Sequence, residues 1–166
     1  MQEHTRNFPD AHISPGFHRT LKTLEMSLAK GIDLPRILVA DNDPITSQLL
    51  SSLGAKQAYR VVSVSDGREA FRVLKSDANF LAAIFNMTIP HLQGVDIVRH
   101  MKTEKRLMRI PVVVVCGENG IKLMADSFAA GAIAFLSKPF NADQLQRVLR
   151  VAISSRNPRK ELQRAA

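Results

Sequence analysis

The sequence has few of the features that mark secreted, membrane-spanning or metal-binding proteins. It contains one cysteine in 166 residues, Cys116, so an internal disulfide is impossible and we expect a reducing compartment, the cytoplasm. No apolar run approaches the length that spans a bilayer, and the N-terminal segment lacks the apolar core of a signal peptide. The five histidines show no metal-ligand spacing with the cysteine. We therefore expect neither a membrane partner nor a zinc site.

Sequence signatures of the common enzyme classes are also missing. The glycine-rich segment 117–120 lacks the lysine–serine pattern of a phosphate-binding loop. No nucleophile elbow or dinucleotide fingerprint occurs, and no histidine is obviously placed to activate Cys116. No helix-turn-helix pattern is present, so we do not expect nucleic acid as a partner. The sequence predicts a protein that is not an enzyme.

The charge is unevenly distributed along the chain. The formal net charge is +8, and the stretch 141–166 contributes +4 of it. This stretch combines the end of the predicted domain with a basic tail, 155–166. Its basic residues either solvate a helix or form a docking patch for an acidic partner.

Short apolar runs alternate with helical patterns from Pro35 onward, which predicts one α/β domain over 35–154. The expected strands are 36–40, 61–64, 81–85, 111–115 and 132–136. The expected helices are 44–54, 67–76, 95–105, 119–130 and 141–154. Unbroken Val, Ile and Leu runs are typical of parallel strands covered on both faces. The fold class is therefore an open, doubly wound parallel sheet.

An additional helix is expected at about 17–30, within an N-terminal extension that covers 1–34. Phe17, Leu21, Leu24 and Leu28 recur at helical spacing and form one apolar stripe. This stripe either packs on the domain or binds a partner or a second copy of the chain.

Polar residues follow four of the predicted strands. They occur in the segments Asp41-Asn42-Asp43-Pro44, Asn86-Met87-Thr88, Cys116-Gly117 and Ser137-Lys138-Pro139. In an open parallel sheet the carboxyl ends of the strands form the ligand-binding edge. We therefore expect these side chains to lie together in one pocket.

The segments ILVADNDP, IFNMTIPHLQG, PVVVVCG and AFLSKPF resemble, in order and spacing, the signature segments of receiver domains of two-component response regulators. The resemblance implies a flavodoxin-like five-stranded sheet with strand order 2-1-3-4-5. It also implies an activity, in which an aspartate takes a phosphoryl group from a histidine kinase with the help of Mg²⁺. A cis peptide bond between Lys138 and Pro139 is implied as well.

Several positions depart from the family pattern that this resemblance supplies. Asn86 stands at the phosphoacceptor aspartate, and Asn42 at an acidic metal ligand next to Asp41. Cys116 replaces the usual Thr or Ser, whereas Lys138 and the switch aromatic Phe135 match the pattern. The degenerate magnesium site would consist of the positions Asp41, Asn42, Asn86 and Thr88, with Asp43 beside it.

These departures remove the chemistry of the family. An amide has no anionic oxygen to attack phosphorus, so Asn86 should not be phosphorylated. Mg²⁺ usually requires one or two carboxylates, so we expect no cofactor, and Mg²⁺ only weakly bound if at all. Lys138 is then expected to pair with Asp41, and an additional bond to the Asn86 amide oxygen is an option.

The sequence predicts a degenerate stand-alone receiver, a pseudo-receiver, that signals by binding another protein independently of aspartyl phosphorylation. The partner could be a histidine kinase or an effector. The expected surface, also suited to a homodimer, combines the helices 119–130 and 141–154 with the strand 132–136; the N-terminal helix is the other candidate. One alternative is a conventional regulator with an engineered Asp-to-Asn change at position 86. A small enzyme on a similar fold is a third alternative that no motif supports.

Overall fold

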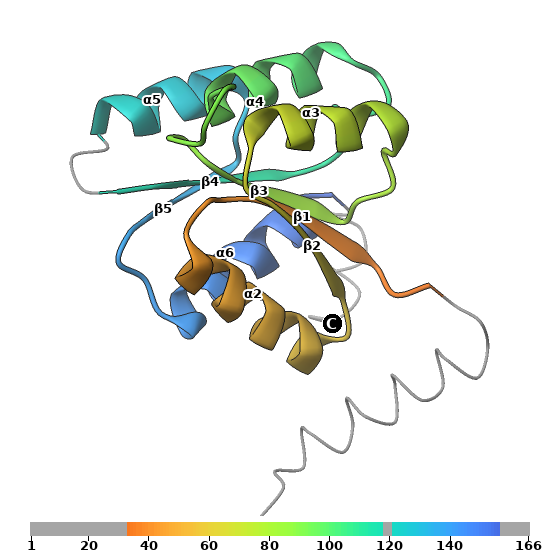
Figure 1. Cartoon of the computed structure of the whole chain (residues 1–166), viewed down its shortest axis with the longest axis vertical. Helices are drawn as coiled ribbons and strands as arrows, with labels where there is room; N and C mark the ends of the chain where they lie inside the picture. The colour runs from red at the N-terminus through yellow and green to blue at the C-terminus, as the bar shows by residue number, and fades with distance from the viewer. Residues whose placement is uncertain (1–32, 118–120, 157–166) are drawn as a thin grey trace, which may run out of the picture. The chain divides into compact units, whose positions relative to one another are not determined.

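A computed structural model describes residues 33–117 and 121–156, which form one parallel five-stranded sheet with helices on both faces (Figure 1). The strands are β1 (Arg36–Ala40), β2 (Arg60–Val64), β3 (Ala82–Asn86), β4 (Val112–Cys116) and β5 (Ala134–Ser137). Their order in the sheet is β2-β1-β3-β4-β5, and all neighbouring pairs are parallel. The predicted flavodoxin-like fold class is therefore confirmed.

Five helices in the described residues connect the strands and cover the sheet. They are α2 (Pro44–Gln57), α3 (Gly67–Ser76), α4 (Gly94–Thr103), α5 (Ile121–Ala130) and α6 (Ala142–Ser155). Figure 1 shows α3, α4 and α5 on one face of the sheet and α2 and α6 on the other. A single helix between consecutive parallel strands produces this two-sided arrangement, because each crossover is right-handed.

The central strands are buried on both faces, which explains their unbroken apolar sequences. All residues of β3 and β4 are buried, whereas the edge strands β2 and β5 are partly exposed. Alternate side chains of each central strand enter opposite layers: Ile84 packs toward α2 and α6, and Phe85 packs toward α3, α4 and α5. Two apolar cores thus hold the strand ends in fixed positions.

The N-terminal caps of α2 and α6 hold the loops that follow β1 and β5. Asp43 caps α2 by accepting a hydrogen bond from the backbone N–H of Ile45, and Pro44 occupies the first helical position. Asn141 and Gln144 form a reciprocal capping box at the start of α6. The loops that follow β1 and β5 therefore have defined paths.

The predicted boundaries of the strands and helices are correct to within three residues. β5 begins at Ala134 rather than at the predicted position 132, because Ala132 and Ile133 belong to the turn after α5. The expected helix at 17–30 lies outside the described residues. Within the described part of the chain, no helix is both long and apolar enough to cross a membrane.

Candidate functional site

The carboxyl ends of the strands bring the predicted polar residues to one edge of the sheet. Asp41 directly follows β1, and Asn86 and Cys116 are the last residues of β3 and β4. Lys138 directly follows β5, which pairs with β4 so that Cys116 lies opposite Ser137. The Lys138–Pro139 peptide bond is cis, as predicted. The expected pocket therefore forms, and its centre is occupied by side chains of the chain itself.

Asp41 is the hub of this pocket, and its side chain is 0% exposed. Its oxygen Oδ1 accepts hydrogen bonds from the Asn86 amide Nδ2 and from the backbone N–H of Asp43, both at 2.9 Å. Its oxygen Oδ2 lies 2.9 Å from the Lys138 ammonium. A carboxylate this deeply buried requires such partners, because leaving it unpaired would cost several kcal/mol, on the order of 3–5.

Lys138 joins two carboxylates across the strand ends. Its ammonium contacts Asp41 as described and also donates to Asp43 Oδ2 at 3.0 Å. The Lys138 side chain is 21% exposed. Its positive charge therefore sits between two negative charges in a partly desolvated site, where ion pairs are stronger than at the open surface.

The pKa shifts reflect this arrangement. The hydrogen bond from Lys138 lowers the pKa of Asp43 below its usual 3.8, and the hydrogen bond from the N–H of Ile45 lowers it further. Burial alone would lower the pKa of Lys138. The hydrogen bonds to Asp41 and Asp43 outweigh burial, so the pKa of Lys138 is raised above 10.5. At neutral pH the pocket therefore holds a charged lysine and a charged Asp43.

Asn86 is held by hydrogen bonds at both ends of its amide. While Nδ2 donates to Asp41, Oδ1 accepts from the backbone N–H of Thr88 at 3.1 Å and from its hydroxyl at 3.3 Å. The start of α4 also lies close to this position: a Cβ at Gly94 would be only 2.6 Å from the backbone oxygen of Asn86. The side chain is thus fixed in the donor-to-Asp41 orientation.

The remaining predicted residues lie around this centre. Asn42 is exposed on the loop after β1, and Cys116 is buried. Phe135 is half-buried on β5 and packs against the core beneath α3, α4 and α5. Asp41, Asn86, Cys116 and Lys138 thus lie at the carboxyl edge of the sheet, whereas Phe135 lies within β5.

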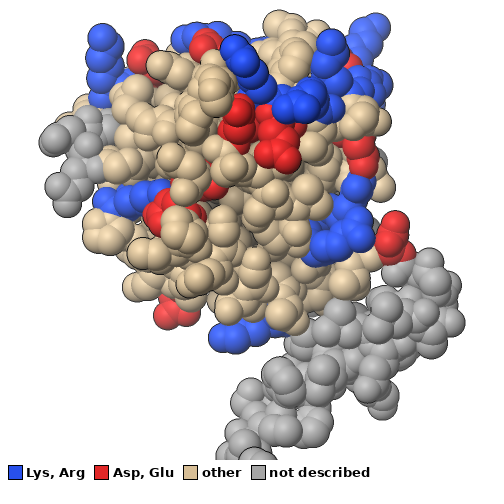
Figure 2. All heavy atoms as spheres, viewed as in Figure 1, with Lys and Arg blue, Asp and Glu red and all other residues tan. Residues whose placement is uncertain are grey.

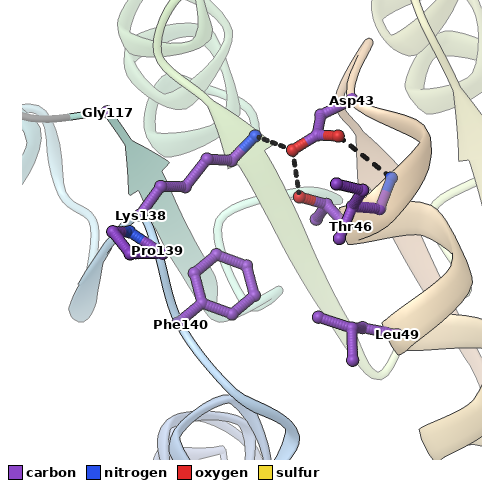
Figure 3. Close-up of a pocket in the computed structure, with 8 residues that line it drawn as sticks. Asp43, Thr46, Leu49, Gly117, Lys138, Pro139 and Phe140 are labelled. Atoms are coloured by element: carbon purple, nitrogen blue, oxygen red, sulfur yellow. Dashed lines mark hydrogen bonds and ion pairs between the residues drawn. The ribbon is translucent and has the colours of Figure 1, made fainter.

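A cavity of about 320 Å³ adjoins the ion pairs (Figure 3). Its lining residues are Asp43, Ile45, Thr46, Leu49, Gly117, Lys138, Pro139 and Phe140. In Figure 3 the Lys138 side chain reaches toward Asp43, while Leu49 and Phe140 form an apolar wall beside it. Asp43 is the single acidic residue in this lining, and Lys138 already neutralises it.

One contact that the sequence left as an option does not form, and one contact was missed. Lys138 does not bond to the Asn86 amide oxygen, because Thr88 occupies that oxygen and the ammonium turns toward the carboxylates. The pairing of Lys138 with Asp41 is confirmed, but its second partner, Asp43, was not predicted. The Asp-Pro dipeptide signals a helix N-cap, and this signal locates Asp43 at the edge of the pocket.

Comparison with known proteins agrees with the geometry. The family model for the response regulator receiver domain matches residues 37–150. The chain belongs to the receiver-domain family. The rice response regulator ORR3 (Oryza sativa subsp. indica), described as a two-component response regulator, is 30% identical over 114 residues, which are 69% of this chain and 87% of that protein.

Solved receiver structures share the fold. A putative response regulator from Chloroflexus aurantiacus superposes with a TM-score of 0.68 at 20% identity, covering 74% of this chain and 99% of that one. The receiver domain of the sensor histidine kinase PA1611 from Pseudomonas aeruginosa has a TM-score of 0.64 at 25% identity, covering 72% and 98%. That structure contains a magnesium ion coordinated in its active-site cleft.

Proposed function

We propose that this receiver domain is a pseudo-receiver, which signals through protein contacts without accepting a phosphoryl group. The observation that carries the proposal is the side-chain network at the acceptor position. Asn86 supplies an amide where the family has its carboxylate nucleophile, and both ends of that amide are hydrogen-bonded. No anionic oxygen at this position is free to attack phosphorus.

The residues present do not fit a magnesium ion. Mg²⁺ prefers octahedral oxygen ligands that include one or two carboxylates. Asp41, which could supply one, is committed to Lys138, Asn86 and a backbone N–H. Asn42, at the other acidic position of the family, carries a neutral amide. The Lys138 ammonium would have to leave Asp41 before a divalent cation could bind there.

Incubation with acetyl phosphate and Mg²⁺ should add no mass to the protein. The expected result follows from the amide at position 86 and from the carboxylates already paired with Lys138. Intact-mass spectrometry under native and denaturing conditions measures it. A phosphoryl adduct that maps to this pocket would contradict the proposal, and a receiver that has its acceptor aspartate serves as the positive control.

The proposed protein-binding surface is the α5–β5–α6 face, formed by those three elements. Ile121, Met124 and Phe128 form a stripe along α5 and are 81%, 37% and 45% exposed. Their spacing of three and four residues places them on one side of the helix. Val151 on α6, which is 61% exposed, adds to the apolar surface of the described residues. Exposed apolar residues at helical spacing are typical of an interaction site.

The two arginines within α6 differ in position: Arg150 lies off the side of Val151, whereas the exposed Arg147, four residues before Val151, lies on the same side of the helix. Arg150 lines a cavity between α2 and α6, together with Gln57 and Tyr59. Val151 is turned by about 100° from it around the helix. On the side shown in Figure 2, Lys and Arg side chains lie over both helix layers and are densest over that of α3, α4 and α5.

An apolar face favours a second copy of the chain as the partner, because two identical patches can meet about a two-fold axis without like-charge repulsion. Phe128→Asp should weaken self-association at least about thirtyfold, since it places an unpaired charge in the contact. Sedimentation velocity over a concentration series measures this. Arg150→Glu, on the other flank of α6, is the control and should leave association unchanged. Equal losses in both variants would contradict the assignment, as would a monomeric wild type.

A further inference from the structure

A third cavity lies at the opposite edge of the sheet from Asp41 and Lys138, where β4 and β5 begin. Its volume is about 520 Å³, within the range of about 300–1,000 Å³ typical of small-molecule sites. It is lined by the end of α4, the segment that leads to β4, the turn before β5 and the end of α6. The lining residues are Lys102, Met108, Arg109, Ile110, Pro111, Ile133, Ser155 and Arg156.

Three of the lining residues are cations, and none is acidic. The Lys102 ammonium has only long hydrogen bonds to backbone oxygens, 3.4 Å to Met108 and 3.3 Å to Ile110. Arg156 donates to the backbone oxygen of Phe80 at 2.7 Å. No carboxylate of the described residues pairs with Lys102 or Arg156. The cavity therefore has positive charge that its own lining does not neutralise.

The side chain of Lys102 is held in one position by contacts along its length. Its aliphatic chain lies against Gly131, where a Cβ would meet Lys102 Cγ at 2.6 Å and which has a φ of +111°. Burial lowers the pKa of Lys102 below its usual 10.5, since no acidic group compensates for the lost water. A bound anion would supply this missing compensation.

We propose that this cavity, the α4–α6 cavity, binds the phosphate group of a small organic phosphate monoester. A phosphate monoester carries a charge of about −1.5 to −2 at neutral pH and three acceptor oxygens, which match three cationic donors better than a carboxylate does. The apolar side chains of Met108 and Ile133, with Pro111, provide contact surface for the organic part of the ligand. The site is separate from the receiver pocket, and it shares only the end of α6 with the proposed dimer face.

Phenyl phosphate is a suitable probe, because it combines a phosphate monoester with a compact apolar group. Titration of the ¹⁵N-labelled full chain at fixed ionic strength should shift amide resonances at the ends of α4 and α6. Arg109→Ala should weaken binding about tenfold or more, because a charged hydrogen bond is lost. Arg109 is exposed, so this change should leave the fold intact.

Lys105→Ala is the matched control, because Lys105 is an exposed cation of the same connecting segment that does not line the cavity. It should change the affinity by less than about twofold, as surface charges contribute little. Equal weakening by both variants would indicate general attraction to a basic surface and would overturn the proposal. Absence of saturable binding would overturn it as well, and so would tighter binding of phenylacetate than of phenyl phosphate.

Discussion

Replacing Lys138 with methionine should destabilise the domain by roughly 2–4 kcal/mol. Breaking a buried ion pair costs roughly 3–5 kcal/mol because one charge is left without its partner, and partial exposure of the ammonium reduces that figure. Methionine keeps an unbranched apolar side chain, one atom shorter than that of lysine, but leaves Asp41, whose side chain is 0% exposed, without its ammonium partner. Urea unfolding at pH 7 measures the loss. Lys122→Met, at an exposed position on α5, is the control and should stay within about 0.5 kcal/mol of wild type.

The pH dependence of the stability lost in Lys138→Met tests whether that loss is electrostatic. The pKa of Asp43 is lowered in the folded protein, so its contribution is present above about pH 4 and disappears as the pH falls through the folded value. The pKa of Lys138 is raised, so its contribution is present below 10.5 and disappears as the pH rises through the folded value. The gap between wild type and Lys138→Met should therefore be widest near neutral pH. A gap that stays constant from pH 3 to pH 11 would indicate lost packing instead.

The double variant Asn42→Asp/Asn86→Asp should accept a phosphoryl group from acetyl phosphate, whereas Asn86→Asp alone should accept little. The single change restores the nucleophile, but it lacks the second acidic position that would hold the metal. The double change supplies both and gives a divalent cation enough negative charge to compete with Lys138. Intact mass with and without EDTA distinguishes the variants. Full phosphorylation of Asn86→Asp alone would show that Asn42 matters little.

Without Mg²⁺, Asn86→Asp should be less stable than wild type. The amide of Asn86 donates to Asp41 at 2.9 Å, and the change would place a second carboxyl group at that distance. Like charges this close raise the pKa of the introduced carboxyl group. Its stability deficit is therefore absent below about pH 4 and grows as the pH rises through the raised value. Asn79→Asp, at an exposed position, is the control for the added charge.

The fold and the location of the site could be predicted because both depend on local sequence patterns. Five apolar residues in a row, as in β4, are typical of a parallel strand that is buried on both faces. The polar residues that follow such strands mark one edge of the sheet. Which acceptor groups the Lys138 ammonium contacts within the site could not be predicted. Whether Lys138 bonds to Asn86 or to Asp43 depends on the turn at Thr88 and on the N-cap of α2, which set where each acceptor oxygen points.

The interaction face also shows where sequence patterns are insufficient. The basic residues of α6 suggested a charged docking surface, which stays a prediction: Arg150 lines a cavity next to α2, whereas Arg147 is exposed on the same side of α6 as Val151. Apolar residues on α5 fit its amphipathic pattern equally well whether they are buried or exposed. Only the packing of the helix shows that Ile121 and Phe128 remain outside the core.

In this pocket the carboxylates of Asp41 and Asp43 are paired with Lys138, a residue of the same chain, rather than with a metal ion that could leave. In a proposed pseudo-receiver of this kind, neither a phosphate donor nor a phosphatase would change the charge balance of the pocket, so the domain would have no enzymatic on and off rates at this site. The amount of active protein would then equal the amount synthesised minus the amount degraded. Expression and turnover, on the time scale of minutes to hours, would then take the place of phosphorylation and dephosphorylation at this pocket.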